Sequence, residues 1–274
     1  MALAGPVFAQ GKSHKNNPPP SRSDLTAPPS SAVTATASGA TPFAWIDDAS
    51  LLEAGAVSVA ISVVRWQGNG ISEVDVPVLD AAIGLAPRVH FTMTVPRVVG
   101  SADPSGALGG VGTSYFSAKI AAINDAKRSV KLSVAPTLEV LGRGVLQGLT
   151  PGERRVHFGL PVSAEVNRGG VRLYGGAGYF TRGVWFTGGG IGGRASNKVY
   201  VSAGYSRSWR RSDGLDIPIS DRDRNEATGS ASYAVTPNVN VFGSLARTIA
   251  TLEENGAGTT IAGGVSFFFA PAVK

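Results

Sequence analysis

The sequence has no cysteine among its 274 residues. This absence excludes disulfide bridges, thiolate catalysis and cysteine-based metal sites together. Charged residues make up only 16% of the chain, whereas ordinary soluble domains carry roughly 25%. No apolar run is as long as the ~18 residues that indicate a transmembrane helix. The composition therefore resembles neither a typical soluble domain nor a helical membrane protein.

The basic excess is small and dispersed. The formal net charge is +6, and the lysines and arginines are scattered rather than clustered with aromatic residues. Nucleic-acid binding is therefore not expected. Basic turns and loops lying near anionic lipid headgroups account for this charge better.

Glycine and a two-residue alternation are what the sequence does contain. Glycine numbers 36 of 274 residues, about twice the usual share of ~7%. Apolar and polar residues alternate from about 56 to 269, and a period of two indicates strands with two different faces. We expect twelve strands, at 56–66, 72–85, 89–98, 113–123, 128–139, 155–166, 171–180, 184–194, 199–210, 225–235, 239–250 and 258–269.

The connections between these strands alternate in length. Tight turns are expected at 86–88, 124–127, 167–170, 195–198 and 236–238, with mostly longer polar connections between them. Bacterial barrels have an even strand number, short periplasmic turns and longer outer loops. The sequence thus predicts an all-β fold, an antiparallel transmembrane β-barrel of about 12 strands with both termini on the periplasmic side. A soluble β-sandwich is the competing interpretation, because its strands alternate too.

The residues before the strands differ in composition. Residues 1–10 look like the remnant of a signal peptide, with small residues at Val7 and Ala9 before a cleavage site. Residues 11–44 are rich in Pro, Ser and Thr and are expected to form a disordered linker. Residues 45–274 would form the barrel, and residues 46–53 could add a helical turn capped by Asp47 or Asp48.

Alternation also assigns the two faces of each strand. In a membrane barrel the apolar side faces lipid and the mixed side faces the lumen. On 128–139, Leu132 and Val134 would face lipid while Ser133 faces the lumen. The inward residues expected to line a substrate path are His90, Lys119, Lys131, Glu139, His157, Glu165, Arg172, Tyr174 and Phe268.

Aromatic residues gather near the expected strand ends, where interfacial girdles lie in such barrels. The residues assigned to these girdles are Trp66, Tyr179, Phe180, Trp185, Phe186, Tyr200, Trp209 and Tyr233.

Three short motifs support a family resemblance. GLAPRVHF at 84–91 resembles a turn between the second and third strands, and GGVG at 109–112 followed by Phe116 and Lys119 resembles the entry into the fourth. The ending GVSFFF at 264–269 also fits. Together they resemble outer-membrane transporters labelled for the MetA pathway of phenol degradation.

That resemblance implies a small barrel that passes aromatic or other apolar molecules, and it brings no catalytic residue. Two departures stand out: Thr113 occupies a position where the family usually has an acid, and residues 270–274 follow Phe269. Many outer-membrane barrels instead end on a terminal aromatic residue, which the assembly machinery reads.

Signatures of enzymes are missing. No G-x-S-x-G or H-E-x-x-H motif occurs. His90, His157 and Glu165 share the expected lumen face, but they lack an activated serine or a third metal ligand. The glycine run 188–193 lacks the Lys-Ser/Thr ending of a phosphate loop, and would instead thin the barrel wall where strands bend or aromatic rings approach. We expect no catalytic residue, no metal and no cofactor.

Two functions remain. The first is an outer-membrane channel for passive passage of small molecules, aromatic or apolar ones among them. The second is a non-conducting structural or surface-anchoring outer-membrane protein, and a lipid-modifying enzyme is a distant third. Expected partners are the lipid bilayer and lipopolysaccharide, the barrel-assembly machinery and a small-molecule solute.

Overall fold

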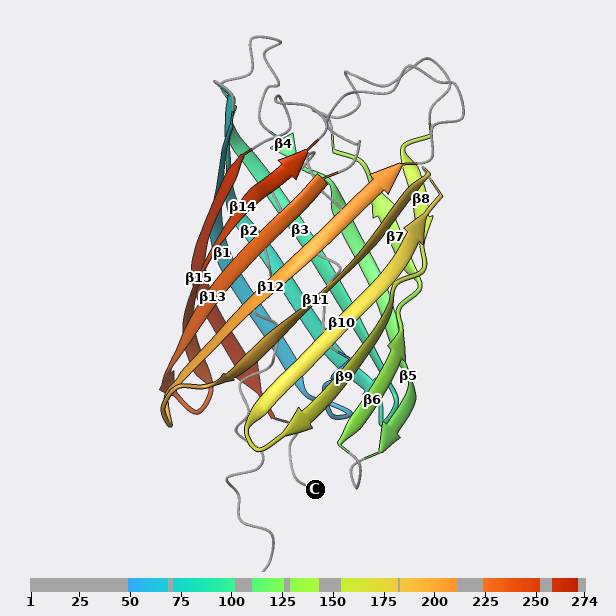
Figure 1. Ribbon diagram of the computed structural model, residues 1–274, viewed down its shortest axis with the longest axis vertical. Helices are drawn as coiled ribbons and strands as arrows, with labels where there is room; N and C mark the ends of the chain where they lie inside the picture. Colours follow the sequence, from blue (N-terminus) through green and yellow to red (C-terminus); the bar gives the residue numbers. More distant parts are fainter. Residues whose placement is uncertain are drawn as a thin grey trace, which may run out of the picture.

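The chain forms one closed antiparallel β-sheet (Figure 1). The computed structural model describes residues 49–68, 71–101, 110–125, 129–142, 154–181, 183–210, 224–251 and 258–270. The strands are β1 (Val57–Gly68), β2 (Ile71–Ala86), β3 (Val89–Ser101), β4 (Gly110–Val111), β5 (Ser114–Asp125), β6 (Val130–Val134), β7 (Thr137–Val140), β8 (Val156–Gly159), β9 (Val162–Arg168), β10 (Val171–Phe180), β11 (Val184–Arg194), β12 (Val199–Arg210), β13 (Arg224–Thr236), β14 (Val239–Thr251) and β15 (Thr259–Phe269).

Three of the twelve barrel strands are divided into two segments, which gives fifteen labels. β4 continues into β5, β6 into β7 and β8 into β9. The sequence predicted unbroken strands at 128–139 and 155–166, and this detail is wrong. Pro136 and Pro161 lie at two of the interruptions, because proline has no N–H to donate to the ladder. Their carbonyl oxygens still accept from Ala118 N at 3.0 Å and Ala135 N at 2.9 Å.

The barrel closes where the first strand meets the last. β1 pairs with β15 from Val57 opposite Phe269 to Gln67 opposite Thr259. The predicted twelve-stranded antiparallel barrel is therefore confirmed.

The two ends of the barrel carry different connections. One end, called here the turn end, holds the tight turns between β2 and β3 and between β9 and β10. At the second of these, Gly169 and Gly170 have φ values of 57° and 83°, as a type I′ hairpin turn requires. The opposite end is called the loop end. Because short turns are periplasmic in bacterial barrels, the turn end is the end that the sequence prediction places on the periplasmic side.

Burial alternates along the strands. On β1, Ile61 and Val63 are exposed on the outer face, whereas Ser62 and Val64 are buried on the inner face. The inner face also contains a small apolar cluster of Val64, Val78 and Ala262. Among the described residues, no helix has the length and hydropathy needed to cross a membrane.

The aromatic girdle prediction is only half right. Tyr179, Trp185, Trp209 and Tyr233 follow the outward alternation of their strands. Trp66, Phe180, Phe186 and Tyr200 lie instead on the inner side. Glycines make room for these rings: a Cβ atom on Gly159 would overlap Phe180, for example, and one on Gly178 would overlap Phe186.

The segment before β1 is not helical. Residues 49–56 form a bend and a turn, which corrects the expected helical turn over its described part. Residues 1–48, with the signal-peptide and linker predictions, lie outside the described residues.

Candidate functional site

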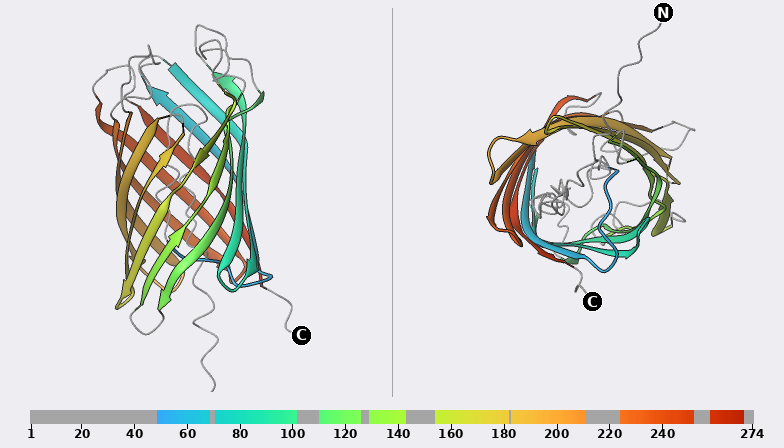
Figure 2. Two further views of the ribbon diagram at one scale, coloured as in Figure 1. Left: turned by 90° about the vertical axis from the view of Figure 1, so that its right-hand side faces the viewer. Right: turned by 90° about the horizontal axis from the view of Figure 1, so that it is seen from below.

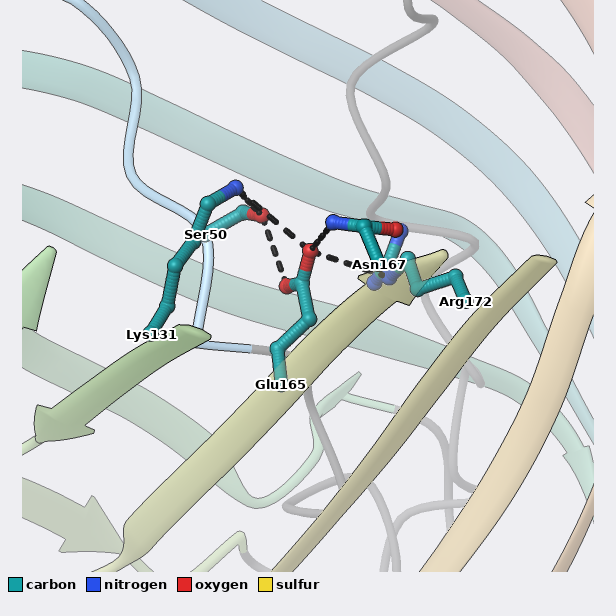
Figure 3. Close-up of polar contacts among 5 residues, drawn as sticks. All are labelled: Ser50, Lys131, Glu165, Asn167 and Arg172. Atoms are coloured by element: carbon teal, nitrogen blue, oxygen red, sulfur yellow. Dashed lines mark hydrogen bonds and ion pairs between the residues drawn. The ribbon is translucent and has the colours of Figure 1, made fainter. Parts of the chain in front are cut away.

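A charged cluster lies on the inner wall at the turn end, centred on Glu165 of β9 (Figure 3). The Glu165 carboxylate is 2% exposed. It accepts hydrogen bonds from Ser50 Oγ at 2.7 Å and from Asn167 Nδ2 at 2.6 Å. Lys131 Nζ and Arg172 Nε lie 3.4 and 3.5 Å from Glu165 Oε1, the oxygen that also accepts from Asn167. A buried carboxylate requires such partners, because an isolated buried charge is very costly.

Strand geometry explains why these side chains meet. Lys131 on β6 and Glu165 on β9 are directly paired across the sheet. Arg172 on β10 is the register partner of Asn167, two residues after Glu165. Residues two apart on a strand share a face, so all four point into the barrel. The cluster holds two cations and one carboxylate.

Ser50 reaches this cluster from outside the sheet. In the view from below, Figure 2 shows the blue stretch before β1 running across the interior of the ring. The stretch leads into β1 at one end. At its other end the Ser50 hydroxyl donates to Glu165 and accepts a hydrogen bond from Lys131 Nζ at 2.8 Å. From β1 the strand order runs β2, β3, β5, β6 and β9. Residues 49–56, called here the crossing segment, thus span the turn-end mouth.

Three further hydrogen bonds hold the crossing segment against the inner wall. The backbone N–H of Leu52 donates to His90 Nδ1 at 3.1 Å. Gly55 N donates to Gly84 O at 2.8 Å, and Gly84 N donates to Ala56 O at 2.9 Å. Gly84 has no room for a side chain, because a Cβ atom there would collide with the backbone oxygen of Glu53. The segment is therefore seated on the inner wall along β2 and β3.

Aromatic rings flank the cluster. The Arg172 guanidinium lies 5.2 Å from the centroid of the Tyr174 ring, within cation–π range. Tyr174 and Tyr200 occupy the space that Cβ atoms on Gly190 and Gly192 would fill. The predicted role of the 188–193 glycines as a thin part of the wall is consistent with this packing. The Arg172 cation is thus close to the phenol ring of Tyr174 on the inner wall.

A second polar group lies near the loop end. Tyr115 Oη donates to Glu139 Oε1 at 3.1 Å. Glu139 on β7 is paired with His157 on β8, whose Nε2 lies 2.8 Å from the backbone oxygen of Arg154. The Phe180 ring packs edge-on to Tyr115 at a centroid distance of 6.5 Å. These groups are buried, so they stabilise the wall rather than line an open surface.

The sequence-predicted path residues all lie on the inner side but form separate groups. Lys131, Glu165 and Arg172 meet at the turn end, with Tyr174 beside them. His90 and Lys119 are cross-strand partners, as are Glu139 and His157. Phe268 is paired with Ser58 at the closing seam.

Some residues of the site were missed. Asn167 could have been found, since it follows Glu165 on the same face. Ser50, however, lies in a segment without periodicity, and nothing in the sequence links it to Glu165.

The His157 and Glu165 pair considered in the sequence does not come together. His157 lies near the loop end and Glu165 near the turn end, so the two do not converge. In the described part of the chain, no three His, Asp or Glu side chains gather closely enough to hold a metal ion.

Comparison with known proteins gives matches in structure alone. No family model matches the chain, and no curated protein matches it.

Three solved structures are similar in fold. A NanC porin aligns at 10% identity over 76% of this chain and 98% of that chain, with a TM-score of 0.57. An outer membrane channel from Pseudomonas putida F1 aligns at 18% identity over 81% and 98%, with a TM-score of 0.58. A KdgM porin aligns at 10% identity over 77% and 99%, with a TM-score of 0.53.

At these identities the likeness concerns the fold. It supports the coarser part of the family resemblance, an outer-membrane β-barrel fold, and does not extend to the MetA label. Twelve strands, a closed sheet and an exposed apolar outer face are the features of a bacterial outer-membrane β-barrel, and this chain has that fold.

Proposed function

We propose that the protein is a passive channel of the bacterial outer membrane for small molecules, aromatic or apolar solutes among them. The observation that carries this proposal is the charged cluster at the turn-end mouth, where Lys131, Glu165 and Arg172 face inward. Rings of inward charge set ion preference in pores. A twelve-stranded barrel is wider than the side-chain-filled eight-stranded type and narrower than sixteen-stranded porins.

The surroundings of Arg172 favour an aromatic or anionic solute. A guanidinium beside the Tyr174 ring offers a cation, while the ring offers a flat apolar surface. A small aromatic carboxylate would use both. The aromatic cargo implied by the MetA-type resemblance agrees with this arrangement.

The crossing segment would narrow the route. It passes over the mouth and takes one of the hydrogen bonds of Glu165 through Ser50. Solutes would pass beside this segment, along the wall that carries Lys131 and Arg172. Of the path residues predicted from the sequence, Lys131, Glu165, Arg172 and Tyr174 would then act together at the turn end.

The alternative is a non-conducting structural or surface-anchoring protein. It is favoured by the burial of many inward side chains, such as Ser62 at 2%, Ser133 at 1% and Asp80 at 6%. In that case the barrel would serve as a membrane anchor, and the barrel-assembly machinery would insert it in the same way.

Single-channel recording in planar bilayers separates the two functions. The full-length folded protein should conduct, and Lys131→Glu should shift its preference towards cations, less so in 1 M salt because charges are then screened over about 3 Å. Lys198→Glu reverses a charge in an exposed turn at the same end, and should change selectivity little. A folded barrel with no conductance and no solute uptake into liposomes would support the anchor. If the protein conducts and Lys131→Glu leaves its ion selectivity unchanged, the channel function stands but the proposed solute path past Lys131 is wrong.

A further inference from the structure

The outer face of the barrel carries a set of arginines near the loop end. Arg65 on β1, Arg207 on β12 and Arg247 on β14 are exposed, and each follows the outward alternation of its strand. Each lies three or four residues before the end of its strand, at Gly68, Arg210 and Thr251 respectively. These strands run in the same direction, so the three side chains lie at a similar height on the wall.

Strand pairing makes this a continuous surface. Arg247 is the register partner of Thr259, which is the partner of Gln67. On the other side Arg247 pairs with Ala227, which pairs with Tyr205. From a strand spacing of about 4.8 Å and a rise of about 3.4 Å per residue, neighbouring arginine Cα atoms are roughly 12 Å apart. Two long side chains can therefore reach one headgroup.

Arg65 and Arg247 donate hydrogen bonds to neutral side chains. Arg247 Nη1 donates to Thr259 Oγ1 at 3.3 Å, and Arg65 Nη2 donates to Gln67 Oε1 at 3.4 Å. The Arg207 guanidinium lies 5.8 Å from the centroid of the Trp209 ring. Within the described parts of β11 to β15 and of β1, the single carboxylate is Glu226, and it points inward at 4% exposure. The described outward side chains of these strands therefore include arginines and no carboxylate.

The position of this surface on the barrel restricts which class of molecule can bind to it. Below it the outer face is apolar, with Val63, Leu245 and Ile261 exposed. Tyr205 and Trp185 are also exposed on this part of the wall, and such amphipathic rings favour the membrane–water boundary. The arginines thus lie where headgroups of the outer leaflet meet the barrel. Arg forms bidentate, charge-assisted hydrogen bonds with phosphate.

We propose that Arg65, Arg207 and Arg247 form a binding surface for the phosphate groups of lipid A, the glycolipid anchor of lipopolysaccharide. The inference rests on the outer-membrane placement of the proposed function and is independent of conduction. Lipid A carries phosphates on a sugar disaccharide, so it presents more than one anionic group to a row of cations. The neighbouring Thr259, Gln67 and Asn225 offer polar groups for its sugar hydroxyls.

The test is lipid binding to the folded full-length chain in detergent micelles. The triple variant Arg65→Gln, Arg207→Gln, Arg247→Gln is compared with a control that removes three exposed cations at the turn end, Arg168→Gln, Arg194→Gln, Lys198→Gln. The probes are lipid A, dephosphorylated lipid A and phosphatidylglycerol. We expect lipid A to bind the triple variant at least about tenfold more weakly than the wild type, and the control variant nearly as tightly.

The outcomes are decisive in both directions. Equal lipid A binding by the triple variant and the wild type would overturn the proposal, as would wild-type binding of dephosphorylated lipid A with full affinity. Equal affinity for phosphatidylglycerol would mean a general anionic-lipid surface, and would also overturn it. If the triple variant does not fold, the Arg207→Gln, Arg247→Gln pair replaces it with the same expectation of weaker binding. Conductance in bilayers free of lipopolysaccharide tests the channel function separately.

Discussion

Replacing Glu165 by Gln tests whether the charged cluster fastens the crossing segment. The change keeps the size of the side chain and removes the carboxylate charge that lies between Lys131 and Arg172. Their nitrogens lie 3.4 and 3.5 Å from the carboxylate oxygen. Two cations would then face each other beside an amide. Ser50 would lose a charged acceptor for its hydroxyl.

The expected loss of stability follows from burial. Removing one partner of a fully buried ion pair costs about 3–5 kcal/mol. Here the Lys131 side chain is 31% exposed, so solvent screens part of its interaction. The new amide can also still accept the hydrogen bond from Asn167. We therefore expect a loss of about 2 kcal/mol in the free energy of unfolding, half of a typical buried-pair value.

Urea titration of folding into lipid vesicles measures this loss. A second readout follows the segment itself, because the chain has no cysteine and a single Leu52→Cys can be labelled cleanly. Labelling by a membrane-impermeant maleimide should be several-fold faster in the Glu165→Gln background. Glu226→Gln is the matched control, since it removes a buried carboxylate paired with Arg224 at 2.7 Å on β13. It should reduce stability without exposing Leu52→Cys. Unchanged stability together with unchanged labelling in Glu165→Gln would refute the reasoning.

Three further predictions concern the wall and its location. Val63→Arg, on the exposed middle of β1, should cost about 2–4 kcal/mol in lipid, whereas Gln67→Arg near the loop end should cost about 0–1; equal costs in vesicle-folding titrations would mean that this face does not meet lipid. Gly159→Ala should cost about 1–3 kcal/mol, because its methyl group meets the Phe180 ring, and this cost should vanish in a Phe180→Ala background. Gly229→Ala, with nothing within 4 Å of the added atom, is the control, and an equal cost there would exclude ring crowding as the cause. Fractionation of cells that make the full-length protein should place it in the outer membrane, in a form whose gel mobility changes on boiling; recovery in the soluble cytoplasmic fraction would contradict the barrel.

The barrel could be predicted from the sequence because apolar and polar residues alternate with a period of two, which marks each strand and its two faces. Alternation places Lys131, Glu165 and Arg172 on one face, and turn residues fix where each strand ends. Proline at positions 136 and 161 also signals the two interruptions, although the expected strands ran through them. These features depend on neighbours along the chain or on strict strand pairing.

The features that could not be predicted depend on how side chains fill the interior of the barrel, and not on the two-residue alternation along each strand. Phe180 lies eight residues after Arg172 on β10, so the alternation itself turns it inward, and the girdle assignment was wrong because it considered only its place near the strand end. The space for the Phe180 and Phe186 rings, left by Gly159 and Gly178 on adjacent strands, has no signal in the alternation. The contact between Ser50 and Glu165 joins residues 115 positions apart. A nonperiodic segment that crosses a mouth leaves no local pattern in the sequence.

The seam between β1 and β15 has a consequence for how the molecule assembles. The other strand neighbours follow one another along the chain, so hairpins can form early from nearby residues. Val57 and Phe269, in contrast, are roughly 200 residues apart in the chain. Joining ends at that separation costs about 2.7 kcal/mol more in chain entropy than closing a ten-residue loop, by the logarithmic dependence on length. We therefore expect the seam to close after the hairpins have formed, and until then the outermost N–H and C=O groups of both end strands remain open to another chain.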